Sequence, residues 1–371
     1  MTSTGPPPAA LSSLLTVIIT TSPTPSAPST DLLSSVLLSF RQHCPGLVCC
    51  RVIVVFDTYD RIEAKARLKR GTVTAEGARN FALYRDNVKE LILEEYRPDR
   101  DPDQALTQDD GVAEYGLSGD WNNVSLKISH THDKWVTFIE PTQRLGFGLA
   151  VRSALRLTST PYVWIHQHDW TLISDIPLQA MLQVMQASSS EAASAAAPAP
   201  PPPPVKYICL PSVRMASYAV SPHVTYFPEL RRLTASLRRD FFAASGSSAE
   251  EGTTTTTIPL TPLFFWHDKP HVASVGHYLE RVFPSRLAMP RGAFIEDTVG
   301  HRARGQMKGG VWARWACWLY YPDEGRRLCL RHLNGRMWRS AEYNLQKRLL
   351  QQAKGKEGGV EADEVDEADE G

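Results

Sequence analysis

The sequence predicts an α/β fold in which helices flank a mainly parallel, mixed sheet. Short runs of β-branched and apolar residues alternate along the chain with segments of helical spacing. The runs are continuous rather than alternating, which is typical of parallel strands buried on both faces. Hydrophobic residues make up 42% and charged residues 22% of the 371 residues, an ordinary globular composition.

The first half of the chain supplies two strands and two helices. Residues 15–20 (LTVIIT) are a β-branched run that ends at a Pro/Ser turn, which predicts a buried strand. Residues 31–40 carry leucine, valine and phenylalanine at helical spacing after cap candidates at 29–31. Residues 51–56 (RVIVVF) predict a second buried strand, and residues 75–96 a second helix. We expect an acidic, turn-rich linker from there to about residue 120.

The second half repeats the alternation. Strands are expected at residues 134–139, 161–166 and 205–210, and helices at residues 146–157 and 178–185. The resulting order, β-α-β-α-β-α-β-α-β, indicates a mainly parallel sheet covered on both faces.

Four segments lack the apolar content to offset the entropy of ordering them: 1–14, 187–204, 243–257 and 353–371. Residues 187–204 end in a proline run, and residues 353–371 carry an acidic tail. We expect disordered ends at 1–14 and 353–371. Between them we expect one domain, residues 15–352, with loop insertions at 187–204 and 243–257.

The charge balance excludes some classes of partner. Lys+Arg and Asp+Glu are both 40, so the net charge is zero. A dominant electrostatic footprint for nucleic acid or anionic membrane is excluded, but a local patch is not. No apolar run approaches the ~20 residues of a membrane-spanning helix. Residues 11–21 are too short and lack the basic flank of a signal peptide, so we expect a cytoplasmic protein without an integral membrane segment.

Polar residues follow three of the expected strands. Thr20 and Thr21 close the first, Asp57 follows the second, and Gln167-His168-Asp169 follow the strand at 161–166. Ligands of parallel sheets bind beyond the carboxyl ends of the strands, so these residues should converge on one edge. Asp57 taken alone is also typical of a loop-capping aspartate.

A later segment, Phe294-Ile295-Glu296-Asp297-Thr298, offers a pair of carboxylates, one of which could act as a general base. If a helix follows, Asp297 and His301 share a face. His332, near the end of a late strand, is a candidate third metal or phosphate contact. The aromatic cluster Trp312, Trp315, Trp318, Tyr320 and Tyr321 is typical of a core, although such rings can line a sugar pocket.

The pattern His-x-His-Asp occurs twice, at 130–133 and 166–169, which raises a metal-dependent hydrolase as an alternative. The first copy precedes a strand and the second follows one, so we expect them at opposite edges of the sheet. The sequence contains no G-x-x-x-x-G-K-[ST] loop, no G-x-G-x-x-G after the first strand and no G-x-S-x-G elbow.

Four stretches together resemble the GT-A fold of family-2-like glycosyltransferases. LTVIITTSPTP is similar to the opening strand and nucleotide-binding turn, and RVIVVFDTYD to the second strand. GFGLAVRSALRLTSTPYVWIHQHDW is similar to a Gly/Ala/Arg helix followed by a strand and an acidic motif, and FIEDTVG to a later Glu-Asp motif. The usual Asp-x-Asp is here Gln167-His168-Asp169, with one carboxylate.

The resemblance implies a glycosyltransferase with a nucleotide-sugar donor and an acceptor hydroxyl on a glycan, lipid or protein. It implies that Thr20, Thr21 and Asp57, with Gln167 beside them, hold the donor. His168 and Asp169 would bind its diphosphate through Mg²⁺ or Mn²⁺. Asp297, with Glu296 as the alternate, would be the base of an inverting transfer, and Arg302 and Arg304 could offset leaving-group charge. The single carboxylate keeps open a non-catalytic nucleotide-sugar-binding module on the same fold.

Overall fold

The computed structural model describes residues 10–101, 104–193, 203–244 and 255–340, together with residues 342, 343, 345, 346 and 349. Most of its strands belong to one sheet. These are β1 (Leu15–Thr21), β2 (Arg51–Phe56), β5 (Thr107–Glu114), β6 (Asn123–His130), β7 (Val136–Pro141), β8 (Tyr162–Gln167), β10 (Tyr207–Cys209), β11 (Arg239–Ala244), β12 (Thr255–Pro262), β13 (His271–Ser274) and β14 (Cys317–Tyr320).

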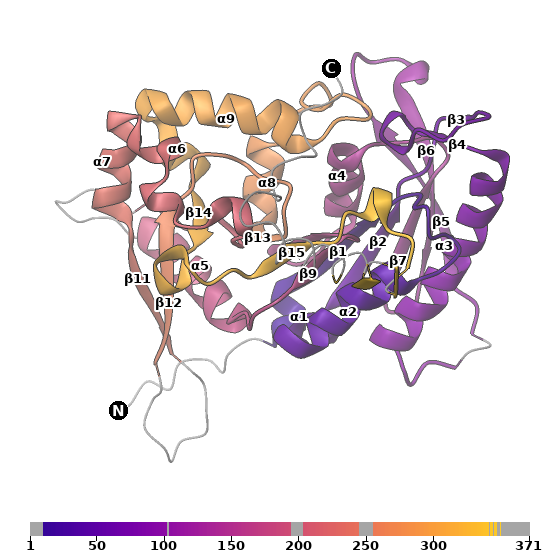
Figure 1. Cartoon of the computed structure of the whole chain (residues 1–371), viewed down its shortest axis with the longest axis horizontal. Helices are drawn as coiled ribbons and strands as arrows, with labels where there is room; N and C mark the ends of the chain where they lie inside the picture. The colour runs from indigo at the N-terminus through magenta and orange to yellow at the C-terminus, as the bar shows by residue number, and fades with distance from the viewer. Residues whose placement is uncertain are drawn as a thin grey trace.

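The sheet is mixed, with a parallel centre. Its order is β11-β12-β14-β10-β13-β8-β1-β2-β7-β6-β5. Strands β8, β1, β2 and β7 pair in parallel, and β10 pairs in parallel with β14. Strands β13, β12 and β6 run against their neighbours. The predicted α/β class, with a large mixed sheet flanked by helices, is therefore confirmed (Figure 1).

Helices connect and cover these strands. They are α1 (Leu11–Leu14), α2 (Asp31–His43), α3 (Ala75–Tyr96), α4 (Phe147–Leu157), α5 (Leu178–Ala193), α6 (Pro222–Thr225), α7 (Pro228–Leu237), α8 (Val275–Arg281), α9 (His301–Gln306) and α10 (Trp312–Trp315). Helix α9 is flanked by π-helical turns at Glu296–Gly300 and Met307–Val311. Two small sheets join β3 (Arg61–Ile62) to β4 (Thr72–Val73) and β9 (Trp170–Leu172) to β15 (Leu330–His332).

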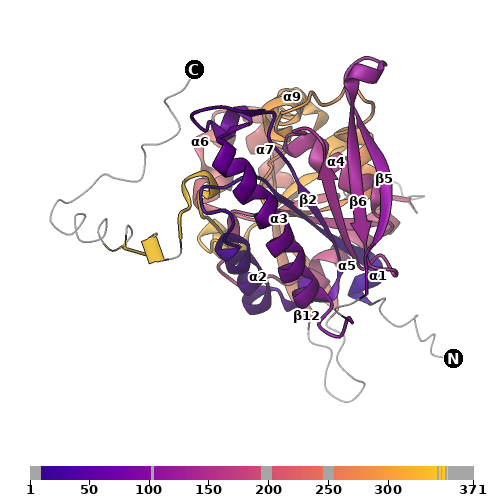
Figure 2. The same cartoon turned by 90° about the vertical axis from the view of Figure 1, so that its right-hand side faces the viewer.

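The order of the central strands reverses between β1 and β8. The chain steps from β1 through α2 to β2 and through α3 toward β7, then returns through α4 to β8 on the other side of β1. Because such crossovers are right-handed, α2 and α3 share one face and α4 covers the other. Helices α2 and α3 lie side by side in Figure 2. The carboxyl ends of β1 and β8 thus flank a topological switch point, where open α/β sheets bind ligands.

The elements predicted in the centre of the chain are present. The strand expected at 51–56 and the helix expected at 75–96 match β2 and α3 residue for residue. Thr74 caps α3 by accepting a hydrogen bond from the backbone N–H of Gly77. Helix α4 follows Gly146, which has φ +78°, and a Cβ there would lie 2.5 Å from the backbone of Gly292. Glycine therefore allows the segment before Glu296 to pack against the start of α4.

Three predictions are wrong at the level of elements. The expected linker up to residue 120 contains β5, an edge strand that is mostly exposed and carries Asp109, Asp110 and Glu114, so it has no apolar alternation to reveal it. The insertion predicted at 187–204 begins too early, because α5 continues to residue 193 with Ser188 buried. Similarly, residues 243–244 and 255–257 belong to β11 and β12, since threonine has a high strand propensity.

The disorder predicted for residues 1–14 is wrong for the described part of that segment. Residues 11–14 form α1, and Leu11 and Leu14 pack against the core. Residues 1–9, 194–202, 245–254 and 351–371 lie outside the described residues, so the disorder predicted there and the single-domain boundaries stay predictions. No helix among the residues described is long and apolar enough to cross a membrane.

The predicted aromatic cluster belongs to the core. Trp312, Trp315, Trp318, Tyr320 and Tyr321 are all buried. The indole N–H of Trp312 donates to the carbonyl of Leu263 at 3.1 Å, which satisfies its polar atom inside the protein. These rings stabilise the second half of the sheet and do not line a sugar pocket.

Candidate functional site

The switch point brings together residues from three elements. The Thr21 hydroxyl, at the end of β1, lies 2.7 Å from Nδ1 of His168 and 2.8 Å from the Tyr84 hydroxyl of α3. The backbone N–H of Ser22 donates to the same His168 Nδ1 at 3.2 Å. The backbone N–H of His168 donates to Thr20, so the ends of β1 and β8 are locked together beyond the last ladder pair.

These contacts fix the proton on His168. A backbone N–H can only donate, so Nδ1 of His168 accepts and the neutral ring carries its proton on Nε2. Burial lowers the pKa of His168, which keeps the ring neutral. His168 therefore presents an N–H donor, rather than a lone pair, on the side away from Thr21.

Asp169 is held by a segment from the far end of the chain. Its Oδ2 accepts hydrogen bonds from His332 Nε2 at 3.1 Å and from the backbone N–H of Gly335 at 3.2 Å. Strand β15 pairs with β9, directly after Asp169, and delivers this C-terminal segment, residues 330–338. Burial alone would raise the pKa of Asp169, but the hydrogen bonds from His332 and from the backbone N–H of Gly335 hold it below its usual value.

The donor atoms here do not fit a resident divalent cation. Asp169 Oδ1 is buried without a hydrogen-bond partner, which is the one feature that would favour a metal. Nε2 of His168 carries a proton, and His332 already contacts Oδ2 of Asp169. In the part of the chain that the structure describes, no group of three or more His, Cys, Asp or Glu residues could hold a metal ion. The predicted role of Mg²⁺ or Mn²⁺ therefore rests on one carboxylate oxygen.

Asp57 caps a loop. Its Oδ1 and Oδ2 accept the backbone N–H groups of Leu145 at 2.6 Å and Gly146 at 3.1 Å, at the approach to α4. Burial raises the pKa of Asp57 to about 6, against these hydrogen bonds and the nearby positive charge of Arg144. Of the two interpretations of Asp57, the geometry is that of the loop cap, and contact with a nucleotide stays a prediction.

The carboxylates at 296–297 reach the same edge through a loop that sequence reasoning missed. Gln167 Nε2 donates to the backbone carbonyl of Asp268 at 2.9 Å. The backbone N–H of Asp268 donates to Glu296 Oε2, and the backbone N–H of Glu296 donates to Asp268 Oδ2, both at 3.3 Å. His267 Nδ1 lies 3.5 Å from Glu296 Oε2. Asp268 thus links Gln167, at the end of β8, to the helix that begins at Glu296.

The two carboxylates have different surroundings. Glu296 is half-buried; burial would raise its pKa, but the hydrogen bonds from His267 and Asp268 hold the value below its usual range. Asp297 is exposed, and no hydrogen bond or ion pair joins its carboxylate to other described residues. Glu296 therefore anchors the helix, and Asp297 is the carboxylate that a ligand could reach.

The expected face shared by Asp297 and His301 is not formed as an α-helical pair. The helix opens with a π-helical turn over Glu296–Gly300, where hydrogen bonds span five residues and the i, i+4 phase is lost. Arg304 is half-buried, and its charge acts on His267, whereas exposed Arg302 packs toward Trp315 and donates to the carbonyl of Arg281. The guanidinium of Arg304 lies 5.8 Å from the centre of the Phe227 ring, and among the described residues neither predicted cation contacts Asp169 or Glu296.

The two His-x-His-Asp patterns lie at opposite edges, as expected. His130 pairs with Thr137 near the start of β7 and hydrogen-bonds Asp109 at 3.0 Å. His168 lies at the carboxyl end of β8. The shared metal centre that a hydrolase would need is not formed. His166, in β8, is a core histidine bonded to Trp164 and to the carbonyl of Trp170.

The sequence analysis missed His267, Asp268, Gly335 and Arg336. The charge of Arg336 acts on His168, so this arginine lies near the switch point. The pair His267-Asp268 follows an apolar run, as His168-Asp169 does, and that repetition is a signal that could have found it. Nothing local marks Gly335 and Arg336, because they reach the site only through the pairing of β15 with β9.

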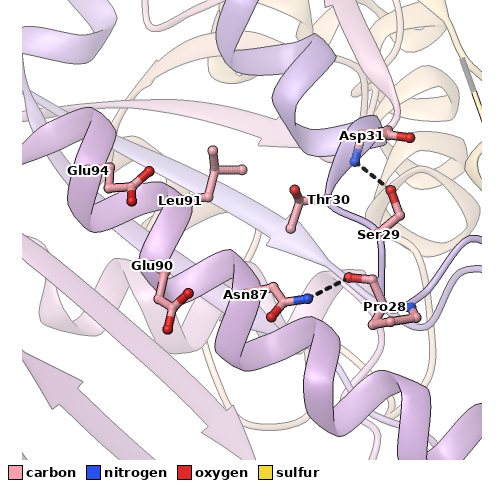
Figure 3. Close-up of a pocket in the computed structure, with 8 residues that line it drawn as sticks. All are labelled: Pro28, Ser29, Thr30, Asp31, Asn87, Glu90, Leu91 and Glu94. Carbon is pink, nitrogen blue, oxygen red and sulfur yellow. Dashed lines mark hydrogen bonds between the residues drawn. The ribbon is translucent and has the colours of Figure 1, made fainter.

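Two surface pockets lie away from these residues. One of about 380 Å³ lies between the start of α2 and the middle of α3 and carries carboxylates of Asp31, Glu90 and Glu94 (Figure 3). Asn87 crosses it to donate to the carbonyl of Pro28 at 3.0 Å. A second, of about 290 Å³, lies between Tyr59 and Glu140. Neither is lined by any of the predicted site residues.

No protein-family model and no curated protein matches this chain. One similar solved structure is a mannosyltransferase from Pyrobaculum calidifontis in complex with GDP-Man and Mn²⁺. The two sequences are 14% identical, and the match covers 94% of this chain and 65% of that chain, with a TM-score of 0.31. A TM-score this low does not establish a common fold, so no residue role is carried over from it.

Proposed function

We propose that this chain is a glycosyltransferase that moves a sugar from a nucleotide-sugar donor to an acceptor hydroxyl with inversion. The observation that carries the proposal is the convergence at the switch point. There the ends of β1 and β8 meet, and the Gln167–Asp268–Glu296 connection supports a position for the exposed carboxylate of Asp297, next to Glu296, beside the same edge. Once the C-terminal segment moves away from His168 Nε2, a donor phosphate could accept a hydrogen bond from that N–H, while Asp297 faces the acceptor.

In the proposed reaction, Asp297 takes the proton of the acceptor hydroxyl as the oxygen bonds to the anomeric carbon. The bond between that carbon and the diphosphate oxygen breaks at the same time, and the nucleoside diphosphate leaves with the electron pair. Arg336 and Arg304, whose charges act on His168 and His267, offset the developing negative charge. Glu296 holds the start of the helix through Asp268 and does not take the proton.

Three finer points accompany this proposal. A GT-A arrangement and a cytoplasmic location stay predictions from the sequence. Use of Mg²⁺ or Mn²⁺ is favoured only by the unpartnered Oδ1 of Asp169. Binding of a metal ion to Oδ1 would require the C-terminal segment to move, because that oxygen is buried.

The first experiment is thermal stabilisation by UDP, GDP and CMP and their common sugars, with and without Mn²⁺. A ligand at 100 times its Kd should stabilise the protein by about 2.7 kcal/mol. A shift that requires Mn²⁺ and disappears in Asp169→Asn would assign a metal to that oxygen. A shift indifferent to Mn²⁺ would support charge neutralisation by arginine. No shift with any nucleotide would overturn the proposal.

Turnover separates the transferase from a binding module. Asp297→Asn should reduce kcat by about 10²-fold or more while leaving the thermal shift with nucleotide unchanged. Asp240→Asn, an equally exposed aspartate on β11, is the matched control and should keep wild-type kcat. Nucleotide binding without transfer to any tested acceptor hydroxyl would favour the non-catalytic module.

A further inference from the structure

Three surface segments meet at the carboxyl edge beside the candidate site. The first is the turn at residues 115–122, between β5 and β6, and the second is the loop at residues 61–70, between β2 and α3. The third, residues 284–292, bridges them. Arg286 accepts the N–H of Gly116 with its carbonyl and donates to the carbonyl of Tyr115, while Arg291 donates to Asp60 at 2.6 Å. The same bridging segment leads on to Glu296 and Asp297.

The figures agree with this placement. Strands β3 and β4, which bracket the loop, stand beyond the same edge of the sheet as α9 (Figure 1). The tip of the β5–β6 hairpin also projects from this edge (Figure 2). The register places that tip beside the end of β7, because Leu126 of β6 pairs with Pro141.

The loop is strongly cationic. Residues 61–70 (RIEAKARLKR) contain Arg61, Lys65, Arg67, Lys69 and Arg70 against one acid, Glu63. All five cations are exposed, and no ion pair links their side chains to other described residues. The loop is anchored through its backbone instead, since Arg144 donates to the carbonyl of Lys69 and Thr72 bonds the backbone of Arg67. Its charges are therefore free to meet an anionic partner.

Large apolar side chains stand beside the cations. Trp121 is 78% exposed and Leu117 71% exposed at the hairpin tip; Leu287, in the bridging segment, is 61% exposed, and Ile62, in the basic loop, 55% exposed. Apolar side chains are usually buried, and an edge that exposes both a cationic loop and large apolar side chains calls for an apolar partner with negative charge.

We propose that this edge, which we call the basic-apolar rim, docks onto the surface of an anionic lipid bilayer. The rim consists of loop 61–70 with Leu117, Trp121 and Leu287. Lys and Arg bind anionic headgroups, and tryptophan favours the boundary between headgroups and acyl chains. A nucleic acid or an acidic protein would match the cations but would leave Leu117 and Leu287 without a complementary partner. The docked orientation turns the carboxyl edge toward the membrane.

One consequence rests on the proposed function. If Asp297 is the base of a glycosyl transfer, the acceptor hydroxyl would be presented at the membrane surface. The docking itself does not depend on that function, so the two proposals fail separately.

The test is sedimentation of the full chain with phosphatidylcholine vesicles, with and without phosphatidylglycerol. We expect binding only with phosphatidylglycerol and a loss of binding as salt is raised, since exposed charges are screened. The triple variant Lys65→Gln/Arg67→Gln/Lys69→Gln should bind at least about tenfold more weakly, because it removes three of the five exposed cations of the loop. The triple variant Arg231→Gln/Arg239→Gln/Arg314→Gln removes the same charge from exposed sites elsewhere and should bind like wild type.

A second variant tests the apolar half of the rim. Leu117→Ser/Trp121→Ser should weaken vesicle binding severalfold and leave binding to soluble inorganic polyphosphate unchanged. Thermal unfolding of each variant confirms that it is folded. Wild-type protein that ignores anionic vesicles overturns the proposal. A basic-loop variant that binds vesicles like wild type also overturns it. The same holds if the wild type binds polyphosphate but not vesicles, and Leu117→Ser/Trp121→Ser does not change that binding.

Discussion

At the scale of single residues, Asp57 combines burial with two backbone hydrogen bonds, and the two effects oppose each other. The bonds to Leu145 and Gly146 favour the carboxylate, while loss of water favours the protonated acid. Burial wins, and the pKa rises to about 6 from the ordinary 3.8. In the folded protein Asp57 therefore holds its proton in a pH range where the unfolded chain has lost it.

This difference predicts a pH effect on stability. Because the folded state binds more protons between pH 3.8 and about 6, the contribution of Asp57 to the free energy of unfolding is complete below that window and is lost as pH rises through it. Asp57→Asn cannot titrate, so the difference in unfolding free energy between wild type and variant should fall across the window and be flat above it. Urea denaturation of both proteins at a series of pH values measures this. Parallel curves, with Asp240→Asn as the control, would contradict the assignment.

The common edge of Thr21, His168 and Asp169 could be predicted from the sequence, because the ends of the buried strands can be located in it. Thr21, His168 and Asp169 follow continuous apolar runs, so their common edge follows from the parallel arrangement alone. The partners of these residues could not be predicted in the same way. Asp268 contacts Glu296 across 28 positions of sequence, and His332 contacts Asp169 across 163, and no local pattern encodes such separations.

At the scale of elements, the C-terminal segment covers the end of β8. The backbone N–H of Leu333 donates to the carbonyl of Asp169 at 2.7 Å, and the rings of Trp170 and His332 lie 4.6 Å apart. Gly335 makes the closest approach: a Cβ there would lie 2.9 Å from His168 Nε2 and 2.9 Å from Asp169 Cβ. Only glycine lets this segment lie against both side chains.

Two glycine-to-alanine substitutions should therefore have opposite signs. Gly335→Ala should lower the free energy of unfolding by about 1–3 kcal/mol, because the new methyl group overlaps His168 and Asp169. Gly305→Ala, within α9 and with no atom near the added methyl, should raise it by up to about 1 kcal/mol. Urea denaturation gives both values, and limited trypsin digestion after Arg336 reports whether the segment has lifted. Equal stabilities for the two variants would contradict the close packing at Gly335.

Buried strands were predicted from the sequence more accurately than edge strands. The buried strands β1, β2 and β8 are continuous apolar runs and were predicted within one residue at each end. Strand β5 lies at the sheet's edge with Ala113 as its one buried residue, so its residues read as a linker. Strand β12 begins in a run of threonines whose composition resembles a disordered segment. A strand produces a continuous apolar run in the sequence when both of its faces are buried, and an exposed edge strand does not.

At the scale of the whole molecule, the two halves of the sheet meet between β8 and β13. On one side lie β1, β2 and β8 with Thr21, His168 and Asp169; on the other, the loop before β13 brings Asp268. Gln167 and Glu296 bond this loop from the two sides. Asp268 is 2% exposed, and its Oδ1 has no hydrogen-bond partner. Of the three hydrogen bonds in this connection, only the one from the Glu296 N–H uses the side chain of Asp268, and the other two use its backbone.

Burial and the neighbouring charge of Glu296 raise the pKa of Asp268 well above its usual value, which favours the protonated acid. Asp268→Asn keeps the size and an acceptor oxygen of that group without a charge and should stay within about 1 kcal/mol of wild-type stability. Asp268→Ala removes the acceptor for the Glu296 N–H and should cost about 2–3 kcal/mol. Because the protonated form is the one favoured by folding, stability due to Asp268 is lost as pH rises, and Asp268→Asn should not show that loss. Urea denaturation at a series of pH values distinguishes the variants, with Asp240→Ala as the exposed control. If Asp268→Ala unfolds like wild type, the Asp268 side chain does not stabilise the junction, and the sheet and the backbone hydrogen bonds of residue 268 hold the two halves together.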